Sequence, residues 1–69
     1  MNNLINELER HLQLSSEYYL EQDKQNNMKV NVYKKEQDMD ELIGSYIFEN
    51  ADLDEIFEIG KQILSDIWS

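Results

Sequence analysis

The chain has 69 residues, with 15 acidic against 6 basic side chains, a formal net charge of −9 at pH 7, and no cysteine or proline. A chain of this length forms a single small domain, residues 1–69, whose core barely offsets the conformational entropy lost on folding. Without cysteine it has no disulfide, and with His11 as its one histidine it has no conventional set of zinc ligands. We therefore predict no metal and no cofactor, and we expect a homodimer or a tight complex with a protein partner.

The first predicted element is an amphipathic helix from Asn3 to about Asp23. Acidic and polar side chains fill one side of it. The residues at helical spacing on its other side are Leu4, Ile5, Leu8, Leu12, Ser15, Tyr18 and Tyr19. The pair Asn26 and Asn27 follows and indicates a stop and a connection, because asparagine tolerates the left-handed backbone conformation found after helices.

Residues 28–48 fit two different structures. Residues 28–34 alternate in polarity and residues 42–48 are rich in strand-favouring side chains, so the two runs can pair as an antiparallel hairpin. The second run also has helical spacing, and the connection 35–41 lacks the glycine or asparagine of a tight hairpin turn. We predict an α+β fold with an N-terminal helix, a two-stranded antiparallel hairpin and a C-terminal amphipathic helix. The alternative is an all-α three-helix bundle.

The last predicted element is a helix that begins after Asp52 and continues to the C-terminus. Its apolar residues recur every three or four positions: Leu53, Ile56, Phe57, Gly60, Ile63, Leu64, Ile67 and Trp68. Asp52 is placed to cap its first amides, and Glu55 stands at the reciprocal position of a capping box. Gly60 falls on the apolar side, so we expect another backbone to cross closely there.

The most informative feature is an acidic tract, which we define as residues 36–60. It contains nine carboxylates and no lysine or arginine: Glu36, Asp38, Asp40, Glu41, Glu49, Asp52, Asp54, Glu55 and Glu58. Such a tract repels nucleic acid and anionic membranes and attracts basic partners. Its carboxylates can resemble nucleic-acid phosphates, which dominate the affinity of nucleic-acid-binding proteins. The alternative is a solvated face that keeps a small protein soluble.

These features predict a non-enzymatic binding protein, an inhibitor of the phage or mobile-element type that occupies the basic groove of a nucleic-acid-binding protein. The carboxylates of Asp38, Asp40, Glu41, Asp54 and Glu58 would supply the electrostatic attraction. Tyr33 or Tyr46 would supply short-range affinity, and Trp68 is a further aromatic candidate for contact with a partner or a second subunit. The alternative is a dimeric structural or antitoxin-like module in which the acidic face serves only for solvation.

Catalytic and metal-binding motifs are missing from the sequence. The chain has only two glycines, Gly44 and Gly60, so it has no glycine-rich phosphate loop and no strand-to-helix elbow around a serine. The acidic runs 38–41 and 52–55 do not continue into a calcium loop. A lone His11 beside the helix stripe is typical of a flanking residue. The chain has no signal peptide and no apolar run of membrane-spanning length, so we expect a cytoplasmic protein.

One stretch points to an enzymatic alternative. Residues 36–40, Glu-Gln-Asp-Met-Asp, resemble the Ser-Gln-Glu-Leu-Asp signature of the small sporulation phosphatases that dephosphorylate response regulators. In that family the signature is followed by apolar residues and a tyrosine, as it is here up to Tyr46, and the preceding helix carries a basic and apolar pair similar to Arg10 and Leu12. The resemblance implies a helical middle region and a catalytic role for Asp40.

Overall fold

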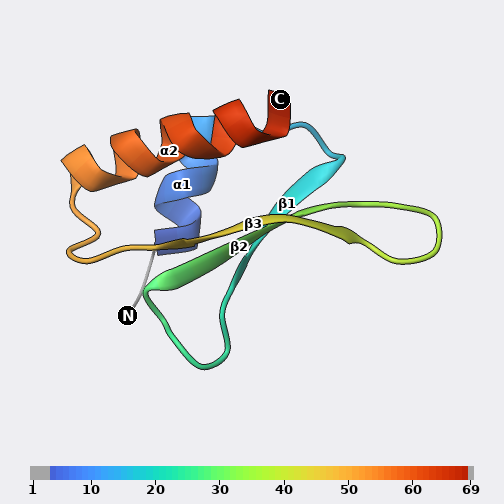
Figure 1. The fold of residues 1–69 in the computed structure, drawn as a ribbon. Coiled ribbons are helices and arrows are strands. Elements are labelled where there is room, and N and C mark those ends of the chain that lie inside the picture. The colour runs from blue at the N-terminus through green and yellow to red at the C-terminus, as the bar shows by residue number, and fades with distance from the viewer. Residues whose placement is uncertain (1–3, 69) are drawn as a thin grey trace.

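Two helices cover one face of a three-stranded sheet (Figure 1). The computed structural model describes residues 4–68. The element order is α1 (Leu4–Leu12), β1 (Tyr18–Gln22), β2 (Lys29–Lys34), β3 (Glu41–Ile47) and α2 (Leu53–Trp68). The strands form an antiparallel meander in the order β1-β2-β3. The predicted α+β class is confirmed, the predicted hairpin belongs to a sheet of three strands, and the all-α alternative is wrong.

The predicted first helix is too long. Its expected first residue, Asn3, lies outside the described residues, and α1 ends at Leu12 instead of Asp23. Gln13 takes a left-handed conformation with φ 49° and donates its backbone N–H to the carbonyl of Glu9 at 3.0 Å, which closes the helix. Residues 18–22 form β1, because pairing with β2 satisfies their backbone groups and directs Leu20 into the core.

The two asparagines lie in the β1–β2 turn instead of at the end of a helix. The Asp23 carboxylate accepts backbone hydrogen bonds from Gln25 at 3.0 Å and Asn26 at 3.1 Å. The Asn26 side-chain oxygen accepts one from the Met28 N–H at 2.9 Å. These side chains replace backbone partners in the turn, which is the usual reason for finding aspartate and asparagine there.

The register of the sheet separates a core face from an open face. Leu20 pairs with Val32, and Val32 pairs with Gly44, so this row faces the helices. The neighbouring row, Tyr19 with Tyr33 and Leu42, faces the other way, where no described element covers it. A register shift after Val32 leaves Ile43 as an extra residue of β3, a bulge. We call the uncovered side the open face.

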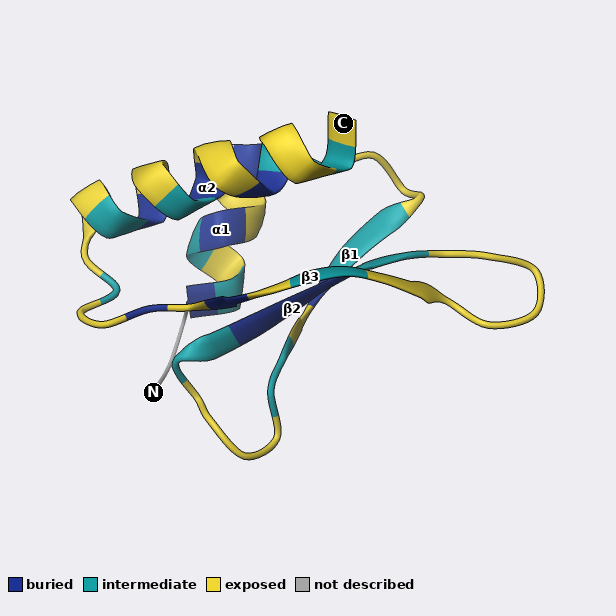
Figure 2. Ribbon diagram, viewed as in Figure 1, coloured by how far each residue is buried: buried dark blue, intermediate teal, exposed yellow. Residues whose placement is uncertain are grey.

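The core lies between the helices and the sheet (Figure 2). Leu8 from α1, Ile63 from α2 and the β2 valines Val30 and Val32 are its most completely buried large side chains. The remaining buried apolar residues are Leu4, Leu12, Leu20, Tyr46, Phe48 and Ile56.

Gly60 lies where α1 and α2 pack together. A Cβ atom at Gly60 would meet only the Leu12 side chain, at 3.4 Å, so the expected close backbone crossing is wrong and the neighbour is a side chain. No helix within residues 4–68 combines the length and the apolar character needed to cross a membrane.

Candidate functional site

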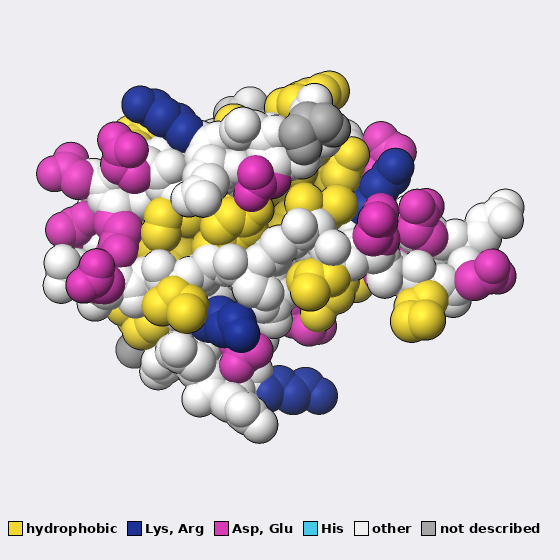
Figure 3. Space-filling model, in the orientation of Figure 1, with side chains coloured by type: hydrophobic (Ala, Val, Ile, Leu, Met, Phe, Trp, Pro, Cys, Tyr) yellow, Lys and Arg dark blue, Asp and Glu magenta, His cyan; other side chains and the backbone are white. Residues whose placement is uncertain are grey.

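The fold divides the acidic tract into two groups. The loop acids lie in the β2–β3 connection and at the start of β3: Glu36, Asp38, Asp40 and Glu41. The helix acids lie after β3 and in the first half of α2: Glu49, Asp52, Asp54, Glu55 and Glu58. From Glu41 to Ile47, the two ends of β3, the chain extends by about 20 Å at about 3.3 Å per residue, and this length separates the groups. Figure 3 shows acidic side chains gathered at both ends of the molecule, and the surface between them is mostly apolar and neutral with a few scattered charges. Of the predicted partner-binding acids, the fold therefore brings Asp38, Asp40 and Glu41 together, and places Asp54 and Glu58 elsewhere.

Two of the helix acids hold the turn that precedes α2. Asp52 accepts a hydrogen bond from the Glu55 N–H at 2.9 Å, which confirms it as the helix cap. Glu55 does not make the expected capping-box bond to Asp52. Its carboxylate instead accepts the N–H groups of Glu49, Asn50 and Ala51 at 2.8, 2.9 and 2.7 Å. These three bonds lower the pKa of Glu55, and they support a turn in which Ala51 has a φ of 58°.

One of the loop acids is also engaged within the fold. Asp40 accepts a hydrogen bond from the Tyr19 hydroxyl at 2.6 Å and one from the Glu36 N–H at 3.2 Å. The bond from Tyr19 is the main cause that lowers the pKa of Asp40, and the same bond raises the pKa of Tyr19 to about 12. Tyr19 stacks on Tyr33 across the strands, with ring centroids 5.3 Å apart and planes 17° apart. Asp40 thus fixes the loop beside a pair of tyrosines on the open face.

Six carboxylates of the tract remain available to a partner. They are Glu36, Asp38 and Glu41 of the loop acids and Glu49, Asp54 and Glu58 of the helix acids, and all six side chains are exposed. None of them forms an ion pair or accepts a hydrogen bond within residues 4–68. Their charges are therefore directed to solvent or to a binding partner.

The two tyrosines predicted at the binding surface differ in position. Tyr33 is half-buried on the open face. Tyr46 is in the core with 7% of its surface exposed, and its hydroxyl donates to the Asp66 carboxylate of α2. Burial and then this bond raise the pKa of Tyr46 above its ordinary value. The aromatic neighbour of the loop acids that was not predicted is Tyr19, and residues 18–22, Tyr-Tyr-Leu-Glu-Gln, show no alternation in polarity that would have indicated it.

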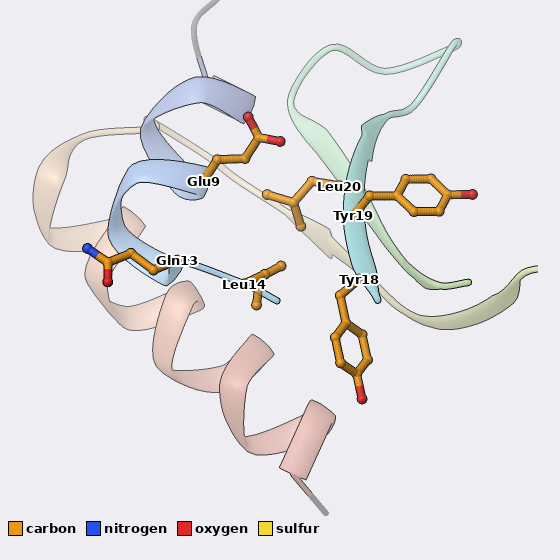
Figure 4. A pocket seen from close by; sticks show the side chains of 6 residues that line it. All are labelled: Glu9, Gln13, Leu14, Tyr18, Tyr19 and Leu20. Atoms are coloured by element: carbon orange, nitrogen blue, oxygen red, sulfur yellow. The ribbon is translucent and has the colours of Figure 1, made fainter. Parts of the chain in front are cut away.

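A hollow lies between α1, the α1–β1 connection and β1 (Figure 4). In Figure 4 Leu20 points from β1 toward α1, and the ring of Tyr19 points away to the other side of the strand. The hollow measures about 150 Å³ and shares Gln13, Leu14 and Tyr18 with a larger groove of about 370 Å³ that extends to Trp68 at the end of α2. Pockets for small ligands typically measure about 300–1,000 Å³, so only the larger groove reaches that size.

The described residues contain no gathered metal ligands. No group of three or more histidine, cysteine, aspartate or glutamate side chains within residues 4–68 is placed to hold a metal ion. The His11 ring packs on the Phe57 ring at a centroid distance of 4.6 Å, as a residue on the flank of α1. This contact gives His11 a packing role at the junction of the two helices.

The helix implied by the resemblance to sporulation phosphatases is not present. Residues 36–40 form the β2–β3 connection, and residues 41–46 belong to β3. Asp40, the residue that would inherit the catalytic role, anchors this connection through Tyr19 and Glu36. The helical middle region that the resemblance implies is therefore wrong for this chain.

Comparison of the chain with protein-family models, with curated proteins and with solved structures finds no match.

Proposed function

We propose that this protein is a non-enzymatic inhibitor or adaptor that binds a basic surface on a nucleic-acid-binding protein. The observation that supports this proposal is the set of six exposed carboxylates with no partner among residues 4–68. Charges arranged in this way accelerate association with an oppositely charged partner and set its orientation. They also disfavour direct contact with nucleic acid, whose phosphates carry the same sign of charge.

The loop acids are the better candidate for the primary contact. The side chains of Glu36, Asp38 and Glu41 lie at the end of the sheet where the Tyr19–Tyr33 pair is found. A guanidinium group can stack on a tyrosine ring and at the same time form charge-assisted hydrogen bonds with a carboxylate. Arginine side chains that normally contact phosphates therefore find both kinds of contact at this end.

The helix acids would act mainly over a longer range. The aromatic side chain among them, Phe57, packs on His11 with ring planes tilted by 57°, and no stacked tyrosine pair of residues 4–68 lies in their group. Attraction between exposed charges extends over a Debye length of about 8 Å at physiological ionic strength. In this proposal they steer the basic partner, and the loop acids with the two tyrosines hold it.

The proposal is tested by affinity capture from a lysate of the source cells with the tagged protein, followed by mass spectrometry. Captured proteins are eluted with a salt gradient and, in parallel, with double-stranded DNA or with RNA. The proposal predicts a basic nucleic-acid-binding protein that leaves at moderate salt and is displaced by nucleic acid. A captured protein that resists both salt and nucleic acid would contradict it.

A further inference from the structure

Helix α2 carries an apolar stripe on its exposed side, next to the side that is buried in the core. We define the outer stripe as Leu53, Phe57, Leu64 and Trp68, which share one side of the helix at 100° per residue. Trp68 is 82% exposed and Phe57 is 52% exposed, whereas Ile56 and Ile63 on the core side are buried. A surface helix needs one apolar side, which packs on the core. The outer stripe extends this apolar side into solvent, where a partner can cover it.

The surface beside the outer stripe is hollowed. Leu64 and Trp68 line the groove of about 370 Å³ together with Leu14 and Tyr18. Phe57 and Leu64 line a shallower hollow of about 100 Å³ at the junction with α1. The outer stripe and these two hollows form one apolar surface along α2, with projections and recesses that can interdigitate with a complementary surface.

The C-terminal half of this surface is close to neutral in a strongly acidic protein, whereas Leu53 and Phe57 of its N-terminal half lie among the helix acids. Residues 59–68 contain one basic and one acidic side chain, Lys61 and Asp66, and residues 10–20 contain Arg10 and Glu17. The whole chain carries a net charge of −9, most of it at the two acidic ends. Contact between two copies meets the least charge repulsion where the near-neutral half of one α2 faces the acidic half of the other.

We propose that the outer stripe of α2 docks a second copy of this chain, with the two α2 helices packed antiparallel. In this arrangement Phe57 of one copy lies near Trp68 of the other. The first turn of each α2, with Asp54, then extends past the end of the opposite α2, so that the helix acids of the two copies point to opposite ends. A parallel arrangement would place the same acids side by side.

A contact between two copies would have to cover a definite share of the surface of each chain. A specific interface buries about 800 Å² on each partner, which is roughly a sixth of the 5083 Å² of accessible surface of this chain. Exposed aromatic and leucine side chains of an apolar patch fit the composition of homodimer interfaces, and charged residues are depleted at their centres. Lys61, the basic residue along the stripe, can cover apolar surface with its hydrocarbon stem while its ammonium group remains in water.

The experiment is sedimentation equilibrium of the full chain over a range of concentrations, combined with fluorescence. Trp68 is the one tryptophan of the chain, so its emission reports directly on the proposed contact. We expect a monomer–dimer equilibrium and a blue shift of the emission as the dimer forms. A dissociation constant of about 1 mM corresponds to a binding free energy of about −4 kcal/mol. A chain that remains monomeric at this concentration would overturn the proposal.

Matched variants test whether dimerisation depends on the outer stripe or on any exposed apolar side chain. Phe57→Gln and Trp68→Gln remove side chains of the outer stripe, and Met39→Gln and Ile47→Gln remove exposed apolar side chains of the loop and of β3. We expect each stripe variant to weaken dimerisation by about tenfold or more and each control to leave it unchanged. Equal weakening by controls and stripe variants would also overturn the proposal. Circular dichroism of all four variants verifies the fold.

The salt dependence of dimerisation through α2 should differ from that of binding a basic partner through the acids. Screening relieves repulsion between two copies of a chain with a net charge of −9, so dimerisation should be unchanged or stronger at high salt. Binding of a basic partner to the acids should weaken under the same conditions. Dimerisation that weakens with salt would contradict the apolar interface, and it would leave the proposed binding of basic partners unaffected.

Discussion

Gly44 is the residue at which an added methyl group has the least room. A Cβ atom there would lie 2.7 Å from the hydroxyl oxygen and 3.0 Å from the ring carbon that carries it in Tyr46. The Tyr46 ring is buried and held by Asp66, so it cannot move aside at little cost. We expect Gly44→Ala to lower the free energy of unfolding by about 1–3 kcal/mol in urea denaturation. An unchanged stability would show that the ring is not fixed over this glycine.

At Gly60, in contrast, an added methyl group should stabilise the fold. An added Cβ would be 3.4 Å from the Leu12 side chain, which is an ordinary contact, and alanine favours the helical conformation by about 1 kcal/mol over glycine. Gly60→Ala should therefore raise the free energy of unfolding by up to about 1 kcal/mol in the same assay. A loss of stability instead would mean that α1 and α2 pack more closely at this position than described.

The bond between Tyr46 and Asp66 links β3 to α2 and should affect stability at alkaline pH. The pKa of Tyr46 is raised in the folded state, so its contribution is present below the unfolded pKa of 10.0 and is lost as the pH rises through the folded pKa. Tyr46→Phe should lower the free energy of unfolding at neutral pH by about 1–3 kcal/mol and reduce its decrease above pH 10. Denaturation curves at neutral and alkaline pH test both effects. An identical alkaline decrease in the variant would contradict the assignment.

At the scale of single residues, the sequence could not reveal the partners of the acids. Asp40 and Tyr19 are 21 residues apart, and their bond depends on the register of β1 against β2 and on the path of the loop. The cap at Asp52 could be predicted because it involves only neighbours in the chain. Local hydrogen bonds follow from short patterns, whereas bonds across the sheet require the fold.

At the scale of elements, Glu55 stabilises the turn between β3 and α2. Its pKa is lowered because its carboxylate accepts three backbone N–H groups. The stabilisation is therefore present above the unfolded pKa of 4.5 and is lost as the pH falls through the lower folded pKa. We expect Glu55→Gln to be less stable than the unmodified chain at neutral pH, and we expect the difference to shrink below pH 4.5.

Thermal melts followed by circular dichroism from neutral to acidic pH measure this difference. Glu58→Gln is the matched control, because it removes an exposed carboxylate of the same helix that accepts no hydrogen bond within residues 4–68. A constant difference between Glu55→Gln and the unmodified chain at all pH values would show that the bonds do not depend on the charge.

The helix α2 was predicted well and α1 was not, for a physical reason. Sixteen residues with a regular apolar pattern and a capping aspartate specify α2 locally. In α1 the same spacing continues past Leu12 toward Tyr18, with no glycine or proline to end it. The change to a strand is determined by pairing with β2, which is a contact distant in sequence. The β2–β3 pairing was predicted because alternation in residues 28–34 was clear.

At the scale of the whole molecule, a continuous acidic tract in the sequence becomes two separate acidic ends. β3 crosses the molecule between them, and the longest dimension of the molecule is 35 Å. The C-terminal half of the outer stripe, with Leu64 and Trp68, is near neutral, and its N-terminal half, with Leu53 and Phe57, lies among the helix acids. This arrangement allows one chain to contact a basic partner at its acidic ends and a second copy through α2.

The most direct test of the central claim compares two variants of equal charge. Glu36→Gln, Asp38→Asn and Glu41→Gln together remove three free loop acids; Glu49→Gln, Asp54→Asn and Glu58→Gln together remove three free helix acids. Both sets leave Asp40, Asp52 and Glu55 in place to hold the fold. Each variant is titrated with a short arginine-rich peptide by isothermal calorimetry. We predict a larger loss of affinity for the loop variant, because only the loop acids lie beside the Tyr19–Tyr33 pair. Equal losses would show that the peptide responds to net charge alone, which would contradict a binding site at the loop.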